Sequence, residues 1–188
     1  PVFALFPLTL IWGMVGYMGN QEATPILLAG LRGLEYRGYD SSGVALLDFS
    51  ELANTNGHAA SGPRLVVEKC KGKVVDLEEL ISKRPLITQI GIGHTRWATH
   101  GRPTEENAHP HRDQSGKVVV VHNGIIENYL TLKERLQADG HTFYTETDTE
   151  VVAHLIGEYV DKEGLSLELA FRKTVAELRG RFALAYIS

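Results

Sequence analysis

Four consecutive valines, Val118–Val121, restrict the fold more than any other feature of this chain. Successive side chains of a strand point to opposite faces, so this strand must be buried on both sides rather than facing water. Other strand-like segments are expected at 13–18, 44–49, 65–67, 89–94 and, at the end of the chain, 181–187. Strands first, a helical stretch next and a final strand favour a layered α/β (α+β) sandwich over alternating βαβ units.

Helices are expected wherever apolar residues recur at helical spacing behind a capping residue. Thr24 is expected to cap the first helix, with Pro25 in its first turn, and a short helix is expected at 76–82. Asn128 is expected to cap a helix that ends at Gly140, and two more helices are expected at 148–160 and 167–178. The segment 54–63, rich in Asn, Gly, Ala and Ser, is expected to be a surface excursion.

The composition narrows the class of protein. The chain has 188 residues, 43% of them hydrophobic, which is enough for one domain with a real core. Its net charge of -4 gives no basic face for nucleic acid, and its single cysteine allows no internal disulfide and favours a cytoplasmic setting. The first 21 residues carry no charged side chain, but glycines and Pro7 interrupt them and no Lys/Arg segment precedes them, so no membrane anchor is expected.

Arg96 follows an expected strand and has polar neighbours in Trp97, Thr99 and His100. A planar guanidinium can bind a carboxylate with two hydrogen bonds, and an amino acid's α-carboxylate fits that geometry. The alternative is a structural ion pair with a carboxylate such as that of Glu105.

Asn123 and Gly124 follow the valine strand. An Asn side chain and a Gly backbone N–H are the donors that an oxyanion hole needs, because both can point at a carbonyl oxygen on which negative charge develops. The alternative is an Asn-Gly turn between two strands.

Asp148 lies in the segment Thr147-Asp-Thr-Glu150, which has the pattern of a capping box with Thr147 as the N-cap. Asp148 is also suited to bind a substrate ammonium opposite Arg96, and the two roles are compatible.

A set of histidines and the single cysteine are two further candidates for a chemical site. His109 and His111, with His94 and His100, have a spacing that permits metal binding, but no carboxylate or thiolate accompanies them and no metal is expected. Cys70 lies between two lysines that favour a lower thiol pKa, yet no base is placed beside it, so an incidental cysteine is the preferred interpretation.

Taken together, these residues resemble the glutaminase domain of the glutamine:fructose-6-phosphate aminotransferases, also called glucosamine-6-phosphate synthases. These are class II glutamine amidotransferases of the N-terminal-nucleophile hydrolase type, with a four-layer αββα sandwich. The motifs that carry the resemblance run in the family's order: Leu34-Glu-Tyr-Arg-Gly-Tyr-Asp-Ser-Ser-Gly43, Lys71-Gly-Lys-Val74, Gly93-His-Thr-Arg-Trp-Ala-Thr-His-Gly101, Asn107-Ala-His-Pro-His111, His122-Asn-Gly-Ile-Ile-Glu-Asn128 and Glu146-Thr-Asp-Thr-Glu150.

The resemblance implies a role for each matched residue. Asn123 and Gly124 would form the oxyanion hole, and Asp148 would bind the amine of L-glutamine. The rest of the glutamine would be held by Arg96, Trp97, Thr99, His100 and His109. Neither a cofactor nor a metal is implied. In the family, an N-terminal cysteine attacks the side-chain amide and the released ammonia passes to isomerase domains that bind fructose 6-phosphate. Homo-oligomerisation through those domains is also implied.

The chain departs from the family at the nucleophile. The opening Met-Cys-Gly-Ile-Val-Gly of the family reads Ile11-Trp-Gly-Met-Val-Gly16 here, so Trp12 stands where the cysteine belongs. Residues 1–11 are expected to be an atypical apolar extension, and 12–188 an amidotransferase domain that is truncated in its last strands and lacks the isomerase domains. An indole cannot attack an amide, so the alternative is a catalytically inactive glutamine-binding or regulatory module.

Overall fold

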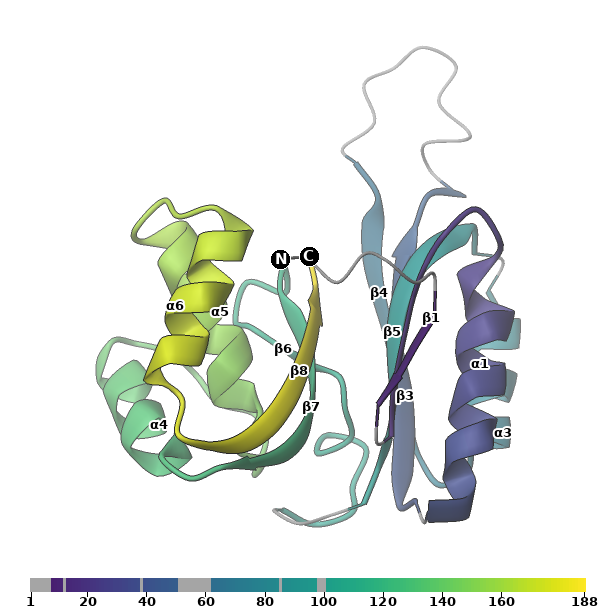
Figure 1. Ribbon diagram of the computed structural model, residues 1–188, viewed down its shortest axis with the longest axis horizontal. Coiled ribbons are helices and arrows are strands. Elements are labelled where there is room, and N and C mark those ends of the chain that lie inside the picture. The colour runs from purple at the N-terminus through teal and green to yellow at the C-terminus, as the bar shows by residue number, and fades with distance from the viewer. Residues whose placement is uncertain (1–7, 12, 38, 51–61, 85, 98–100) are drawn as a thin grey trace.

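The computed structural model describes residues 8–11, 13–37, 39–50, 62–84, 86–97 and 101–188. In this part of the chain two antiparallel sheets lie face to face, and helices cover the outer face of each sheet (Figure 1). The order helix, sheet, sheet, helix is the four-layer αββα architecture predicted from the sequence.

The first sheet has five strands in the order β1-β2-β5-β3-β4. Their bounds are β1 Leu8–Ile11, β2 Met14–Met18, β3 Ser41–Asp48, β4 Arg64–Lys71 and β5 Thr88–Arg96. Strand β1 was not predicted: within the apolar extension, residues 8–11 pair antiparallel with β2. Strands β3 and β4 are longer than predicted, because a strand's ends are set by its partners in the sheet as well as by its own apolar run.

The second sheet has three strands in the order β6-β7-β8, with bounds β6 His111–Arg112, β7 Val119–Ile126 and β8 Gly180–Ile187. Strand β7 lies in the middle and pairs antiparallel with both neighbours.

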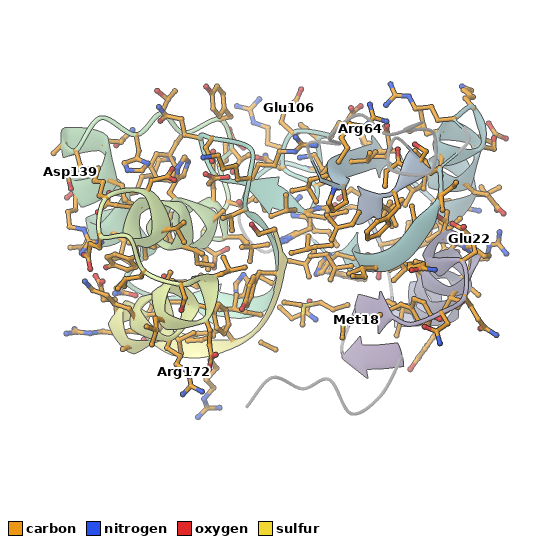
Figure 2. The ribbon with its side chains drawn as sticks, turned by 90° about the horizontal axis from the view of Figure 1, so that it is seen from above. Met18, Glu22, Arg64, Glu106, Asp139 and Arg172 are labelled. Atoms are coloured by element: carbon orange, nitrogen blue, oxygen red, sulfur yellow. The ribbon has the colours of Figure 1, made fainter. Side chains whose placement is uncertain are left out.

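Helices α1 (Ala23–Leu34) and α3 (Val74–Ser82) cover the first sheet, and a 3-10 helix, η1 (Glu35–Arg37), follows α1. Helices α4 (Tyr129–Ala138), α5 (Glu150–Asp161) and α6 (Leu167–Glu177) cover the second sheet. In Figure 2, Glu22, just before α1, and Asp139, just after α4, lie at opposite ends of the molecule with the two sheets between them.

The valine strand shows why the layers form. Val118 and Val120 pack with α4, α5 and α6, whereas Val119 and Val121 pack against the first sheet. Each of these valines is at most 2% exposed. The alternation along β3 is the same: Val44 faces the helices of its own side and Ala45 faces the other sheet. The burial on both faces predicted for the valines is confirmed.

Two glycines of β5 bring α1 close to the first sheet. A Cβ atom at Gly91 would lie 2.7 Å from Leu27 Cδ1, and one at Gly93 would lie 3.0 Å from Leu31 Cδ1. Gly91 and Gly93 therefore have a packing role.

The predicted caps are corrected in two places. The N-cap position of α1 is Glu22 rather than Thr24, whose hydroxyl lies 2.9 Å from that of Thr88. Helix α5 begins at Glu150 without the capping box of Thr147, because the Glu150 carboxylate accepts hydrogen bonds from the Tyr144 and Thr145 backbone N–H groups instead.

Asn128 occupies the predicted N-cap position of α4, yet its side chain bonds elsewhere: it donates to Glu177 O and accepts from Arg179 N. Of the predicted excursion, only Gly62 and Pro63 belong to the described residues. No helix in the described ranges is both long and apolar enough to cross a bilayer.

Candidate active site

The polar residues after the valine strand meet the end of β5 across the two sheets. Strand β5 supplies His94 and Arg96, β7 supplies Asn123 and Gly124, and the segment before α5 supplies Asp148. His94 Nε2 lies 2.8 Å from Asn123 Oδ1, which joins the first sheet to the second at this point.

The contact with His94 fixes the orientation of the Asn123 amide. Burial lowers the pKa of His94 to about 4, so its ring is neutral near pH 7. Its Nε2 faces the Asn123 oxygen, an acceptor, so this contact places the single ring proton on Nε2. Because the Asn123 oxygen accepts from His94, its Nδ2 group points away from that ring as a donor.

Gly124 is held in a conformation that only glycine adopts without strain. Its φ is +115°, and a Cβ atom there would lie 2.0 Å from Arg181 O on β8. Asn123 and Gly124 are opposite Ala183 and Phe182 in the β7–β8 pairing, so the alternative of an Asn-Gly turn is wrong. Pairing with β8, a strand more than 50 residues later, overrides the local turn preference.

The backbone immediately after position 12 adjoins Asn123. Gly13 has a φ of +101°, its carbonyl oxygen accepts from Thr95 N at 2.8 Å, and a Cβ atom on it would lie 3.6 Å from Asn123 Oδ1. Trp12 itself lies outside the described residues. Gly13, the residue that follows it, adjoins the end of β5 and the amide of Asn123.

Arg96 is 4% exposed and is oriented by the backbone around it. Its guanidinium donates to Arg102 O at 3.2 Å and to Gly101 O at 3.3 Å, and it pairs with Asp40 at 3.5 Å. The expected structural ion pair therefore exists with Asp40, not with Glu105. Burial lowers the pKa of Arg96, while Asp40 and Asp148 oppose this shift, and the group stays cationic at neutral pH.

Of the neighbours predicted to act with Arg96, one is described. Trp97 directly follows β5 and is 68% exposed, so its indole lies on the surface. Thr99 and His100 lie outside the described residues.

Asp148 is 4% exposed, and its Oδ2 accepts from Ile126 N at 2.9 Å at the end of β7. His122 Nδ1 lies 2.9 Å from Thr149 Oγ1 and 3.8 Å from Asp148 Oδ1. These contacts place the Asp148 carboxylate at the same end of β7 as Gly124, with negative charge suited to an ammonium group.

His109 belongs to a group of buried imidazoles that includes His94 and His111. Its ring stacks on that of His94 with centroids 4.2 Å apart, and it meets the ring of His111 edge-on at 4.6 Å. Burial lowers the pKa of both His109 and His111 well below the ordinary 6.5, and further positive charges nearby act in the same direction. Among the described residues, no three His, Cys, Asp or Glu side chains are arranged to hold a metal ion.

Cys70 lies on the helix-facing side of the first sheet, packed under α1 and α3. Burial raises its thiol pKa, so the lowering suggested by its lysine neighbours is wrong, and Ser42 Oγ lies 3.3 Å from its sulfur. The thiol belongs to a packed core.

Sequence reasoning missed the residues that orient the site. His94 was considered as a metal ligand, but it orients Asn123, and Asp40 was given no role although it pairs with Arg96. Asp40 belongs to the polar segment that ends at Gly43. Its contact with Arg96 depends on the pairing of β3 with β5, which the sequence around Asp40 alone does not reveal.

Comparisons with known proteins agree on the family. The profile described as "Glutamine amidotransferase domain" matches residues 94–188. The glutamine–fructose-6-phosphate aminotransferase [isomerizing] of Symbiobacterium thermophilum is 50% identical over 175 residues, which is 93% of this chain and 26% of that protein. The enzyme of the same name from Aquifex aeolicus is 52% identical over 176 residues, covering 94% of this chain and 27% of its own length.

A solved structure supports the fold as well. The glutamine phosphoribosylpyrophosphate amidotransferase from B. subtilis superposes with a TM-score of 0.73 at 28% identity, covering 94% of this chain and 35% of that chain. This chain spans about a quarter of the length of the curated relatives it matches. The match of the amidotransferase profile to half of the sequence, together with the four-layer fold, shows that this chain belongs to the glutamine amidotransferase domain family.

Proposed function

We propose that this chain is the glutaminase half of a glutamine:fructose-6-phosphate aminotransferase, which hydrolyses L-glutamine to glutamate and ammonia for glucosamine 6-phosphate synthesis. The identity of about 50% to curated enzymes of that name supports this proposal. The observation that carries it is the bond between His94 and Asn123, because it orients an amide donor near Gly13, the residue that follows the sequence position of the family's nucleophile.

We assign the ligand groups by charge. Arg96 would bind the glutamine α-carboxylate, with Trp97, Thr99 and His100 beside it, and Asp148 would bind the α-ammonium. The opposite charges of the buried Arg96 and Asp148 match those of a free amino acid. His109 would line the same site.

The chemistry would follow covalent catalysis by a thiol. A cysteine sulfur at position 12 would add to the side-chain amide carbon, and Asn123 Nδ2 and Gly124 N–H would bind the resulting oxyanion. Loss of one such donor costs about 3 kcal/mol in activation free energy. Ammonia would leave with the thiol's proton, delivered by the cysteine's own α-amine. Water would then cleave the thioester to glutamate and restore the thiol.

Trp12 cannot perform the first step, because an indole carbon or nitrogen does not attack an amide and an internal residue has no free α-amine. We propose that the functional protein has cysteine at this position, since Trp and Cys codons differ at one base. The presence of Trp12 in the sequence favours one other candidate, a glutamine-binding or regulatory module without turnover.

Two measurements separate these candidates. Calorimetry on the chain with Trp12 should detect glutamine binding, and a chain that begins at residue 12 with Trp12→Cys should release ammonia from glutamine. The matched control is the same shortened chain with Trp12→Ala. Binding without ammonia release from the Trp12→Cys chain supports the regulatory module, and the absence of both rejects the proposal. Resequencing the DNA around Ile11 then decides which residue is genuine.

The remaining assignments complete this proposal, and the relatives' greater length supports the part that concerns further domains. We propose that residues 12–188 form the amidotransferase domain and 1–11 an extension, and that the ammonia is used by isomerase domains that bind fructose 6-phosphate. Assembly into a homo-oligomer through those domains and a cytoplasmic location belong to the same proposal.

A further inference from the structure

The segment that carries His109 lies against the first sheet, where the side chain of Lys69 holds its backbone by hydrogen bonds. Lys69, on β4, donates from its Nζ to two backbone carbonyl oxygens, Glu106 O at 3.0 Å and Ala108 O at 3.0 Å. Glu106 lies at the margin of the molecule, between the two helix layers (Figure 2). The Lys69 ammonium therefore spans the segment just before His109.

The sheet beneath this segment is shaped to accept it. Gly43 pairs with Lys69 on one side and with His94 on the other. A Cβ atom at Gly43 would lie 2.3 Å from His109 O, so the missing side chain lets the His109 backbone approach β3. With the His94 ring stacked on His109, three adjacent strands each fix one part of the segment: β4 through an ammonium, β3 through a glycine and β5 through an imidazole.

We propose that Lys69 is a positioning residue for the glutamine site, which it serves by fixing the backbone of 106–108 and thereby the place of the His109 ring. The effect on glutamine binding rests on the proposed function, whereas the positioning of His109 by Lys69 is a property of the protein without ligand. Lys69 touches no group assigned to the substrate, so its influence must pass through His109. A hydrogen bond from a charged donor to a carbonyl is about twice as strong as a neutral one, which is why an ammonium suits this position.

The electrostatics agree with a covered ammonium. Burial lowers the pKa of Lys69 to about 8, opposed by Glu105, Glu106 and Glu150 and reinforced by Arg112. These side chains border the same groove, of about 590 Å³, so Lys69 is enclosed on one side by the segment it fastens. As the pH rises above 8, loss of the proton should weaken both carbonyl bonds.

The test compares three variants of the whole chain. Lys69→Met removes the donor but keeps the aliphatic chain, and Lys69→Arg restores a cation. Lys71→Met is the matched control, because Lys71 lies two residues along the same strand, on the same face, and is exposed. All variants are first checked for an unchanged thermal midpoint to within a few degrees.

Two readouts follow His109 without any ligand: the 15N and 1H signals of its imidazole in NMR, and hydrogen exchange of the backbone amides in 104–108. We expect Lys69→Met to shift the ring signals and to speed exchange, whereas Lys69→Arg and Lys71→Met stay close to the parent protein. Calorimetry should show glutamine binding weakened roughly tenfold in Lys69→Met, the order expected for lost charge-assisted hydrogen bonds, with most of it restored in Lys69→Arg.

The outcomes separate this inference from the proposed function. Unchanged His109 signals in Lys69→Met overturn the inference, whether or not glutamine binds. Shifted signals with an unchanged glutamine affinity also overturn it, because His109 would then move without consequence. If the parent chain itself binds no glutamine while the ring signals shift, the positioning of His109 stands, and the proposed function fails as well if the Trp12→Cys chain releases no ammonia.

Discussion

Mild acid should destabilise this protein because three of its histidines are buried without charge. His94, His109 and His111 are each at most 5% exposed. Burial lowers their pKa values, to about 4 for His94 and well below 6.5 for the other two. The unfolded chain binds protons at these rings near pH 6.5, whereas the folded chain does not, so the free energy of unfolding must decrease as the pH falls through 6.5.

The size of this decrease in the free energy of unfolding depends on the pH interval between the histidine pKa values of the unfolded and folded chain. Between pH 6.5 and 5, a histidine that protonates only in the unfolded state contributes about 2 kcal/mol, since one pH unit corresponds to about 1.4 kcal/mol. His94 contributes this amount, because its folded pKa of about 4 lies below this interval, and His109 and His111 add contributions of the same sign; the whole stability of a typical domain is about 5 to 15 kcal/mol. For His94 the loss should level off near its folded pKa of about 4.

The assay is urea denaturation followed by circular dichroism at several values between pH 7 and 5. This window lies above the range where carboxylates with lowered pKa values, such as Glu146 and Glu150, begin to protonate. The variant His111→Gln removes one of the three rings while leaving an amide to face Thr147 Oγ1, so the free energy of unfolding should depend less steeply on pH than in the parent. A free energy of unfolding that changes by less than about 1 kcal/mol across this window would refute the reasoning.

Three further predictions concern single residues. Asp148→Asn keeps an oxygen for Ile126 N but removes the charge, so glutamine affinity measured by calorimetry should fall about 10-fold to 100-fold with little change in thermal midpoint; an unchanged affinity contradicts the assigned role. Gly124→Ala should destabilise the fold by roughly 2 kcal/mol or more in urea denaturation, because of its positive φ and the approach of Arg181 O, and a neutral effect would contradict the backbone geometry. Cys70 should react with a thiol reagent at pH 8 far more slowly in the folded protein than in urea, because burial raises its pKa; equal rates would exclude a packed thiol.

Local sequence patterns predicted the layers well. The alternation within Val118–Val121 required a strand covered on both faces, and the structure divides these side chains between two cores. Helical spacing placed α1, α3, α4, α5 and α6 close to their observed bounds. These features depend on residues a few positions apart, so the periodicity of the sequence is enough to predict them.

The errors came where contacts or burial in the folded protein override a local pattern. The Thr24 hydroxyl bonds to Thr88, far along the chain, instead of capping α1. Glu150 turns to the Tyr144 and Thr145 amides rather than completing a capping box. At Cys70, the thiol pKa is raised in spite of the two neighbouring lysines, because desolvation by burial is the largest effect on that thiol.

The sequence by itself determined the groups that we propose for the chemistry: a guanidinium, an amide, a carboxylate and a glycine in separate polar segments, together with a tryptophan where the family has its nucleophile. Only the tertiary structure decided how these groups are held. The pairing of β3 with β5 brings Asp40 to Arg96, and the packing of the two sheets brings His94 to Asn123. The chemistry of a side chain is set by its residue type, whereas its orientation depends on contacts between segments that meet only when the layers have formed.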